Sequence, residues 1–420
     1  MPIKGLRLYR KLMPFSYDGI VRFIYTSYFL AYMEASLYLM NPWWENKEFN
    51  PGISREKYLK ELVDGLNKKD IVFITGLRRV GKTMLLKQII HELLKRVEPK
   101  KILYLTLDFI TFKDKSIHEL IEEFRKIHAH KIDDKLYLFL DEVTQIPYFE
   151  KELKNLYDLE NVKIYASSSS ASLLKSKNNY LVGRSKIVEI LPLDFNEFLL
   201  FSGIKIAKSN GHLLDKEFEE YLMIGGMPEY VLTRDIGYIK NTVEQIIYKD
   251  IIAVHDIKDK DSVEKLFILL CERIGKRFTY SKLARVLSIS VDSVRRYVGY
   301  FIDTFLFYSI ERHAKSLNER IASPKKVYIS DIGIRNVFVG FKDKGALFEN
   351  LTFLKIKNRD PHYFFENEKE IDFIVDKTAI EVKFKQNIDE EELEFFNNSK
   401  FKVKLLVKEF KDLEKLDTLV

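Results

Sequence analysis

The sequence is poor in cysteine, glycine and proline. Its single cysteine, Cys271, excludes an intrachain disulfide, and no cluster of cysteine and histidine has the spacing of a zinc site. Because Cys271 directly follows an apolar run, we expect a buried, unreactive thiol in a reducing cytoplasm. Only 17 glycines and 10 prolines occur in 420 residues, 46% of which are hydrophobic. That composition argues against a disordered chain and suits two or three domains.

The sequence also lacks a membrane-spanning run near its N-terminus. An uncharged stretch at 23–33 covers eleven residues between Arg22 and Glu34, whereas a bilayer requires about twenty. A buried or interfacial amphipathic helix is favoured over membrane association for this stretch. No signal peptide is visible. We therefore expect a cytoplasmic protein with no integral membrane span.

The excess of positive charge is small overall, but it is concentrated in one segment. The net charge is +7, which by itself says little about partners. Residues 273–300, however, contain seven basic side chains against one acid, Asp292. Almost the whole net charge could be assigned to this segment, which makes it the first place to look for contact with an anionic partner.

The order of the apolar runs predicts an α/β core. Between residues 46 and 204, short apolar runs of strand length alternate with helical patterns such as 84–97 and 117–127. The strand-like runs are 71–75, 102–107, 136–140, 162–166 and 187–190. This alternation predicts a parallel sheet with crossover helices. Residues 205–320 then read as helices, 321–420 as a small α/β segment, and 1–45 as an N-terminal extension of unknown role.

A glycine-rich segment at 76–83 has the spacing of a nucleotide-binding P-loop, G-x-x-x-x-G-K-[ST]. Its glycines allow backbone N–H groups to face phosphate oxygens at the start of a helix. Lys82 is expected to reach the β- and γ-phosphates of ATP, and Thr83 to bind Mg²⁺. The predicted nucleotide-binding residues are Gly76, Arg79, Val80, Gly81, Lys82, Thr83 and Met84.

Two acids follow an apolar strand about sixty residues later. The run 136–140 leads directly into Asp141 and Glu142. A buried parallel strand delivers such side chains to the ligand-binding end of a sheet. Asp141 is expected to hold Mg²⁺ through its water shell, and Glu142 to orient or deprotonate the attacking water. An acid after an apolar run is common, but together with the P-loop it indicates hydrolysis.

Two further residues are candidates for the reaction. A hydroxyl in the serine run 167–170, of which we select Ser169, could touch the γ-phosphate or the water; a polar turn that caps a helix at 171–174 is an equal alternative. Arg184 could stabilise the transferring charge, on its own nucleotide or on that of a neighbour in a homo-oligomer, or could form an ordinary surface ion pair.

Several segments resemble a family of AAA-type P-loop ATPases found in archaea and bacteria. The resemblance rests on the following segments: the loop at 76–83, Leu-Asp-Glu at 140–142, Ser-Ser-Ala at 169–171, Gly183-Arg184, 191–198, 225–228 and 328–333. It covers residues 42 to 410 and implies an ATPase core, a helical lid, a winged-helix region and a restriction-endonuclease-like tail. Family members read Thr-Gly-Ser where this chain has Ser167-Ser168-Ser169, so the role of Ser169 is carried over with that difference.

The basic segment contains a helix-turn-helix pattern. Residues 280–298 read as two short helices joined at 288–291, with Ser293, Arg295 and Arg296 outward on the second. Such a helix surrounded by positive charge can contact the phosphates of DNA. The alternative is a winged helix that only packs against the ATPase core or a protein partner.

The C-terminal segment carries the pattern of a PD-(D/E)xK nuclease. Asp372, Glu381 and Lys383 fall on one face of a predicted hairpin whose turn is Lys377-Thr378. In such enzymes carboxylates hold Mg²⁺, and the lysine polarises the attacking water. Glu349 matches the additional acid of the family. Alternating strands buried on one side would show the same spacing without any chemistry.

Two main hypotheses follow from the sequence. The first is a Mg²⁺-dependent ATPase that drives DNA binding or cleavage through the winged-helix and nuclease-like segments. The second is an ATP-dependent regulatory switch with an inactive nuclease-like tail that binds a protein partner. A passive ATP-binding scaffold is a third, weaker option.

Overall fold

A computed structural model describes residues 32–112, 114–171, 180–206, 213–385 and 389–418. Their contacts divide the chain into two compact units. The first unit comprises the chain up to 188, except for 75–82 and 169–176, which belong with 189–420 in the second. Most of the uncharged stretch at 23–33 lies outside the described residues. Across the described part, no helix is both long and apolar enough to cross a bilayer.

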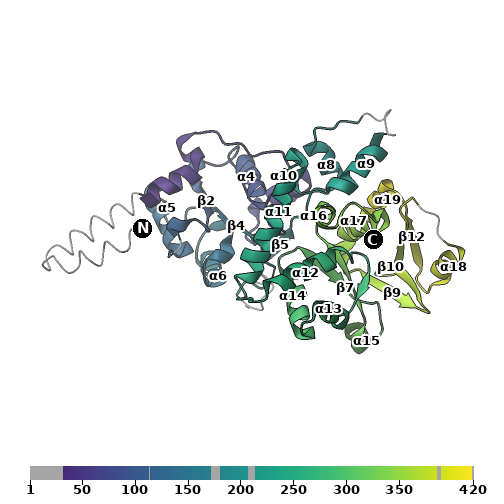
Figure 1. The fold of residues 1–420 in the computed structure, drawn as a ribbon. Helices are drawn as coiled ribbons and strands as arrows, with labels where there is room; N and C mark the ends of the chain where they lie inside the picture. The colour runs from purple at the N-terminus through teal and green to yellow at the C-terminus, as the bar shows by residue number, and fades with distance from the viewer. Residues whose placement is uncertain (1–31, 113, 172–179, 207–212, 386–388, 419–420) are drawn as a thin grey trace. The chain divides into compact units, whose positions relative to one another are not determined.

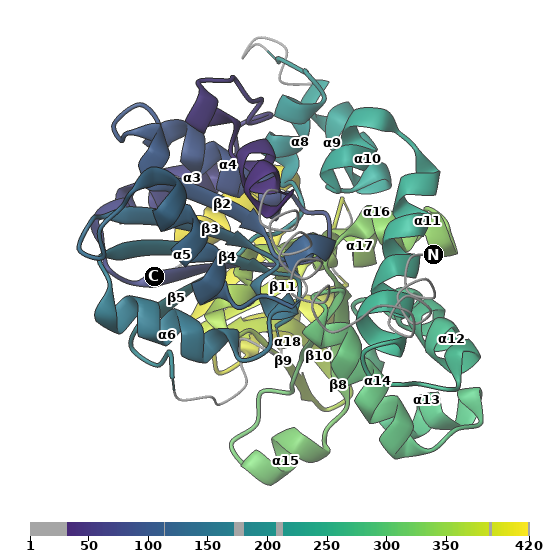
Figure 2. The ribbon, with the colours of Figure 1, turned by 90° about the vertical axis from the view of Figure 1, so that its left-hand side faces the viewer.

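The first unit contains a five-stranded sheet in the order β2-β3-β4-β1-β5, whose strands lie side by side in Figure 2. The neighbouring pairs β2–β3 and β3–β4 are parallel, and β1, β3 and β4 are buried at every residue, as in a sheet covered on both faces. The predicted α/β core is therefore confirmed. The strands are Ile71–Thr75 (β1), Ile102–Thr106 (β2), Leu136–Asp141 (β3), Val162–Ser168 (β4) and Ser185–Glu189 (β5).

Helices alternate with these strands, as crossover connections require. They are Glu56–Asp64 (α3), Lys82–Leu93 (α4), Ile117–His128 (α5) and Phe149–Leu159 (α6). Helix α5 begins at the predicted residue because Ser116 and Glu119 form a capping box around its first turn. Helix α4 begins earlier than the apolar pattern at 84–97, since its first turn directly continues the glycine-rich loop.

Strand β2 lies at one edge of the sheet. A segment that the sequence had placed outside the core covers the free side of this strand. The side chain of Asn41 accepts a hydrogen bond from Tyr104 N (2.6 Å) and donates one to Tyr104 O (3.0 Å), as a neighbouring strand would. The indole N–H groups of Trp43 and Trp44 both donate to Ile102 O, at 3.1 and 2.8 Å. Residues 41–45 thus satisfy the exposed hydrogen-bonding groups of the sheet edge.

The second unit contains two smaller sheets (Figure 1). One has the antiparallel order β6-β8-β7, and the other the order β12-β11-β10-β9. The first of these sheets runs across residue 320, where the sequence suggested a boundary between segments. The strands are Arg277–Phe278 (β6), Phe307–Ile310 (β7), Lys325–Ile329 (β8), His362–Glu366 (β9), Lys369–Val375 (β10), Thr378–Val382 (β11) and Val403–Val407 (β12).

Most of the remaining chain of this unit is helical. Cys271, the last residue of α12, is fully buried, as expected, and burial raises the pKa of its thiol. A π-helical turn, η7 (Ile246–Ile252), continues α11. The helices are Phe195–Phe201 (α8), Leu213–Ile224 (α9), Pro228–Thr233 (α10), Ile236–Gln245 (α11), Lys260–Cys271 (α12), Tyr280–Leu287 (α13), Val291–Asp303 (α14), Leu317–Ala322 (α15), Ile332–Val339 (α16), Lys344–Ile356 (α17), Glu390–Asn398 (α18) and Phe410–Lys415 (α19).

Two of the glycine motifs meet at one buried carboxylate in this unit. Asp331 accepts hydrogen bonds from Gly226 N (2.6 Å) and Ile334 N (2.8 Å). A Cβ on Gly333 would lie 1.8 Å from the carbonyl oxygen of Ile224. Glycine is therefore required there because two backbone segments touch. The motifs at 225–228 and 328–333 have a packing role that accounts for their glycines.

The C-terminal hairpin corrects the predicted register. Val375 pairs with Thr378 and Phe373 with Ile380, so the turn is Asp376-Lys377 and not Lys377-Thr378. Asp376 adopts a left-handed φ of 52°, which aspartate tolerates better than lysine or a β-branched residue. The register moves by two residues. A shift of two leaves every side chain on its predicted face.

We expect Asn41→Ala to destabilise the first unit by about 2–4 kcal/mol, because two backbone groups of Tyr104 would lose their partner. Trp43 and Trp44 are the only tryptophans of the chain, so their fluorescence during urea unfolding reports on this region. Asn67→Ala, at an exposed position, is the matched control. Equal urea midpoints for the two variants would show that the Asn41 contacts contribute nothing.

Candidate functional site

The loop between β1 and α4 depends on its two glycines. Gly76 has a φ of 139° and Gly81 of 99°, outside the range that other residues adopt readily. A Cβ on Gly76 would lie 2.3 Å from the carbonyl oxygen of Ile190, so the loop passes too close to that backbone for any side chain. The ammonium group of Lys82 donates to the carbonyl oxygens of Gly76 and Leu77, at 3.0 Å each. The lysine is therefore held against the loop at the N-terminus of α4.

The side chains of both arginines in this loop contact residues of α11 and of η7, the turn that continues α11. Arg78 forms a bidentate ion pair with Asp250 of η7, with distances of 2.8 Å from Nε and 2.6 Å from Nη2. The guanidinium of Arg79 lies 5.1 Å from the ring centre of Tyr238 and 3.4 Å from the hydroxyl of Thr242, both on α11. The side chain of Arg79 therefore contacts a helix, which leaves its backbone as the part available to a phosphate.

In the first unit, Asp141 at the end of β3 is surrounded by hydroxyl groups. The carboxylate is 3% exposed and accepts hydrogen bonds from Thr83 Oγ1 (2.6 Å), Tyr104 OH (3.0 Å) and Ser167 Oγ. Burial and the charge of Asp141 raise the pKa of Tyr104, so the phenol stays a neutral donor. A buried carboxylate beside a threonine hydroxyl is an all-oxygen donor set, which suits Mg²⁺.

Glu142 follows with an unusual backbone. Its φ of 53° and ψ of 48° are left-handed, a conformation that costs a non-glycine residue about 1–3 kcal/mol and that clusters at functional sites. The N–H of Glu142 donates to Ser167 Oγ at 2.9 Å. Ser167 thus joins the backbone of Glu142 to the carboxylate of Asp141 and fixes the relation of the two acids.

The serine that the structure brings to these acids is Ser167, whereas the sequence selected Ser169. Strand β4 continues two residues beyond the apolar run, through Ser168. Ser167 consequently belongs to the sheet edge beside Asp141, and Ser169 follows the strand. Period-two alternation alone does not separate the two, because residues 167 and 169 fall on the same face of an extended strand; the end of β4 at Ser168 does. Most of the helix expected at 171–174 lies outside the described residues.

Arg184 and the hydrophobic loop residues occupy ordinary positions. The Arg184 guanidinium pairs with Asp158 at 3.0 Å, the surface ion pair that the sequence left as the alternative. Asp158 also binds Lys154 at 2.8 Å. Val80 is fully buried, and Met84, on the first turn of α4, is 37% exposed.

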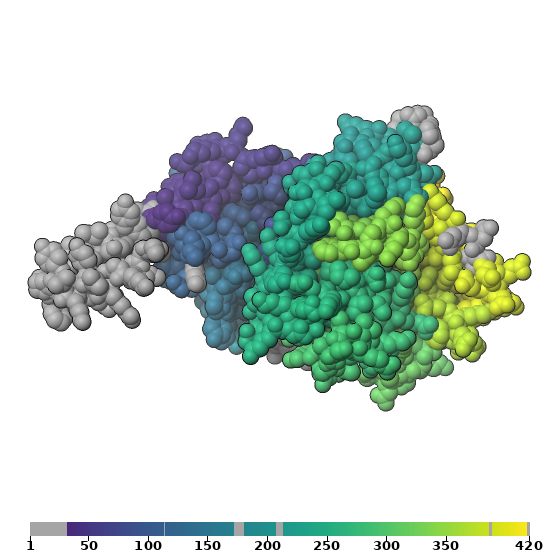
Figure 3. Space-filling view, in the orientation of Figure 1, coloured from purple at the N-terminus to yellow at the C-terminus, as the bar shows by residue number. Residues whose placement is uncertain are grey.

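The basic segment forms two packed helices, α13 and α14, on the face turned to the viewer in Figures 1 and 3. The buried residues are Leu283 and Ala284 on α13 and Val294, Tyr297, Val298 and Phe301 on α14. Three of the seven basic residues pair with acids: Arg277 with Glu370 at 2.9 Å, Lys276 with Asp343 at 3.4 Å and Arg295 with Asp292 at 3.9 Å. Four basic residues of the two helices are exposed: Lys282, Arg285, Arg295 and Arg296.

The C-terminal acids gather around a lysine that the sequence did not single out. The Nζ atom of Lys326, on β8, lies 2.6 Å from Glu349, 2.9 Å from Glu370 and 3.2 Å from Asp372. Lys383 lies 3.4 Å from Glu381. Across the described residues, no group of three or more histidine, cysteine or acidic side chains could hold a metal ion.

The burial of this cluster changes its protonation. Burial and the nearby Asp372 raise the pKa of Glu349 to about 7 and that of Glu381 to about 9. Burial alone would lower the pKa of Lys326, but the carboxylates around it, Glu349 first, raise it. Lys326 is therefore a permanent cation inside this unit.

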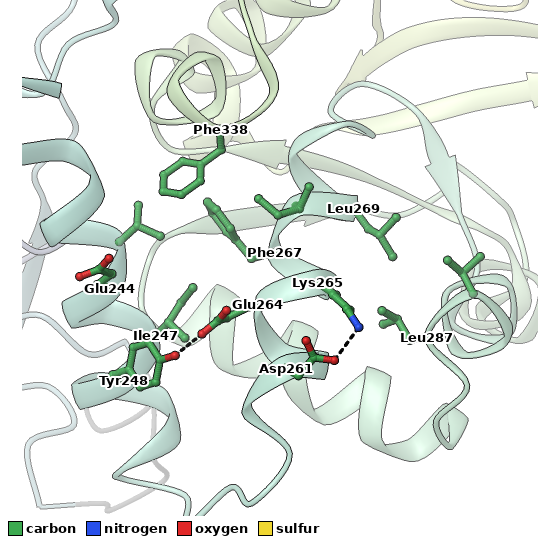
Figure 4. Close-up of a pocket in the computed structure, with 13 residues that line it drawn as sticks. Glu244, Ile247, Tyr248, Asp261, Glu264, Lys265, Phe267, Leu269, Leu287 and Phe338 are labelled. Carbon is green, nitrogen blue, oxygen red and sulfur yellow. Dashed lines mark hydrogen bonds and ion pairs between the residues drawn. The ribbon is translucent and has the colours of Figure 1, made fainter. Parts of the chain in front are cut away.

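A cavity of about 670 Å³ lies elsewhere in the second unit, between η7, α12 and α13 (Figure 4). Its wall is mainly apolar, with Ile247, Phe267 and Phe338 turned toward it. Tyr248 donates a hydrogen bond to Glu264 across its rim. Nothing in this lining resembles a phosphate or metal site, so this hollow is not the candidate reaction centre.

A family match covers the glycine-rich loop and both acids. Residues 68–199 match the family described as AAA domain, and residues 215–345 match a domain of unknown function, DUF8612. A solved structure titled as the Walker-type ATPase PABY2304 of Pyrococcus abyssi is similar with a TM-score of 0.42 and 16% identity, over 68% of this chain and 96% of that one.

Two relatives come from Methanocaldococcus jannaschii. Uncharacterized protein MJ1637 is 29% identical over 319 residues, 69% of this chain and 66%, just under two thirds, of that relative. Uncharacterized protein MJ1544 is 30% identical over 384 residues, 84% of this chain and 81% of the relative. With that identity over most of both chains and an AAA domain at 68–199, this chain belongs to the same family as MJ1544, a family of AAA-type ATPases.

Proposed function

We propose that the chain binds ATP through the loop at 76–83 and hydrolyses it with Mg²⁺. The observation that carries this proposal is the 2.6 Å contact between Thr83 Oγ1 and the buried Asp141 carboxylate. Thr83 is covalently next to Lys82, so the residue that contacts phosphate and the residue that contacts metal are adjacent in the chain. Thr83 and Asp141 would hold Mg²⁺, which neutralises charge on the phosphates.

Glu142 is the residue we assign to the attacking water. A carboxylate directly after the metal-binding acid can orient water or take its proton, a role worth about 10²–10⁴ in rate. The hydrogen bond from its own N–H to Ser167 keeps the strained backbone in place. Ser167 acts as a positioning residue in this scheme, since it contacts Asp141 and Glu142.

The two arginines of the loop connect the proposed nucleotide site to η7 and α11. Arg78 and Asp250 are partly buried and joined by two charge-assisted hydrogen bonds. Asp250 lies in a π-helical turn, a feature frequent at functional sites. A change in the loop on binding or release of phosphate would therefore pull on η7 and α11. We propose that this link makes α11 and η7 respond to the nucleotide state.

Contact with DNA is a second candidate function. Its support is the exposure of four basic side chains on α13 and α14, at Lys282, Arg285, Arg295 and Arg296. The N-terminal turns of the second helix of such a pair commonly meet the major groove or the phosphates. The competing proposal is that these helices bind a protein partner.

We expect Lys82→Ala to weaken ATP binding by about 100-fold, because a buried ammonium that contacts phosphates would be removed. Lys87→Ala, on the same helix α4, is the matched control and should bind ATP normally. Titration with a fluorescent ATP analogue measures both. Equal affinity in the two variants would contradict the assigned role of the loop.

Glu142→Gln should retain ATP binding but lower the rate of phosphate release by about 10²–10⁴, since the amide cannot accept the proton of water. Glu150→Gln, in the first turn of α6, removes an acid nearby and should leave turnover unchanged. Phosphate release that is as fast in Glu142→Gln as in the wild type would remove Glu142 from the mechanism.

Reversal of the Arg78–Asp250 pair tests the link to the helices. Arg78→Asp and Asp250→Arg should each lower ATP turnover by about tenfold, and the double variant should recover most of it. Reversal of the Arg234–Glu220 pair, an exposed pair in the same unit, should change little. If ATP turnover by the double variant is no higher than that of the single variants, the pair does not couple the loop to the helices.

DNA contact predicts a salt-dependent effect of Arg295→Glu with Arg296→Glu. Affinity for duplex DNA should fall, and the slope of log K against log salt should shrink by about one for each phosphate that the protein no longer neutralises. The control makes the same charge change at Lys400 and Lys402, both exposed. Binding that falls equally in both double variants would reflect net charge alone, and no binding by the wild type would favour a protein partner.

A further inference from the structure

The acids of the C-terminal segment surround a lysine where a nuclease would hold a metal ion. Lys326 is fully buried, and its ammonium lies within 3.2 Å of three carboxylates, from Glu349, Glu370 and Asp372. They come from α17 and β10, and the lysine itself from β8. A cation with three acidic oxygens around it occupies the centre that these carboxylates share.

Other protein groups also bind oxygens of this cluster. Tyr328 donates its hydroxyl to Glu349 Oε1, the oxygen that Lys326 contacts, at 2.7 Å. The second oxygen of Asp372 accepts from Val382 N at 3.0 Å, and that of Glu370 from Arg277 Nε at 2.9 Å. Hydrogen bonds of this kind use the lone pairs that a metal ion would need.

The surroundings of Glu349 also leave little room for a metal ion. Gly275 has a φ of 72°, and a Cβ at that position would lie 2.8 Å from Glu349 Oε2. One oxygen of Glu349 thus faces Lys326 and Tyr328, and the other faces the backbone of Gly275. A catalytic metal site keeps an open position for water or substrate, whereas Glu349 has Lys326 and Tyr328 at one oxygen, the chain at Gly275 near the other, and a side chain that is 15% exposed.

Replacement of the lysine by a metal would be costly. Lys326 lies on β8, the middle strand of its sheet, and is 0% exposed, so its side chain cannot leave the cluster unless the side chains around it move. Its buried ammonium would have to leave three partly buried carboxylates, which would then remain without a cation in contact. A divalent ion would in addition have to lose most of its own water shell.

We propose that the Lys326 ammonium permanently replaces a divalent cation in this cluster, so that the C-terminal segment works without metal and does not cleave phosphodiester bonds. Glu349 and Asp372 then serve as counter-ions that lock β8, β10 and α17 together. Lys383 lies beside this lock, 2.9 Å from Glu392 and 3.4 Å from Glu381. The proposal does not depend on ATP hydrolysis, since it concerns a separate set of residues.

The test is Mn²⁺ binding to the full chain without nucleotide, measured by electron paramagnetic resonance. Wild type and Asp372→Asn should bind the same number of ions. Lys326→Met should gain a bound ion, and its melting temperature should fall in chelator and rise by several degrees with Mn²⁺. Lys325→Met, the neighbouring lysine on β8 that pairs with Glu311, is the matched control and should gain none.

Two results would overturn the proposal. The first is a Mn²⁺ ion, or Mn²⁺-dependent nicking of plasmid DNA, that the wild type shows and Asp372→Asn loses. The second is a folded Lys326→Met protein whose response to Mn²⁺ is that of Lys325→Met. The comparison of wild type with Asp372→Asn stands by itself even if Lys326→Met fails to fold.

Discussion

The candidate ATPase site depends on one buried carboxylate that is satisfied by hydroxyl groups alone. A charged group with so little exposure is tolerated only when hydrogen bonds replace the lost water. Asp141 obtains them from Thr83, Tyr104 and Ser167, on α4, β2 and β4. Because the three donors belong to different elements, the carboxylate also fixes their relative positions. Thr83 is the last residue of the glycine-rich motif, so its hydrogen bond to Asp141 also holds the end of that motif. Ser167 holds the backbone of Glu142 in the same way.

Both units contain such a polar lock, but the two have different chemistry. Around Asp141 the partners are neutral hydroxyls, which a metal ion or water can exchange at small electrostatic cost. Around Lys326 the partners are three carboxylates and the centre is itself a cation. The first arrangement is suited to a reaction that binds and releases a charged substrate. The second is suited to permanent structure, because removal of the lysine would leave three carboxylates without their cation.

The sequence was informative where the chemistry is local. The P-loop spacing, the apolar strands and the acid pair after 136–140 follow from short-range rules, and the strands form close to the predicted residues. It was less informative where long-range contacts decide. Asn41 as a partner of β2 and Lys326 as the centre of three acids are contacts across many residues, and no local pattern marks them. The hairpin turn was predicted two residues away in pairing register because the apolar pattern fits both turns equally well. The left-handed conformation of Asp376 favours the turn that the structure has.

The central claim is that the Asp141 network supports hydrolysis of ATP. Phosphate release by the wild type with ATP and Mg²⁺, compared with Asp141→Asn, tests it most directly, with nucleotide binding measured on the same samples. The account predicts turnover by the wild type and a loss of at least about 100-fold in the variant, with ATP still bound. Equal turnover in the two proteins, or none in a wild type that binds ATP, would contradict it.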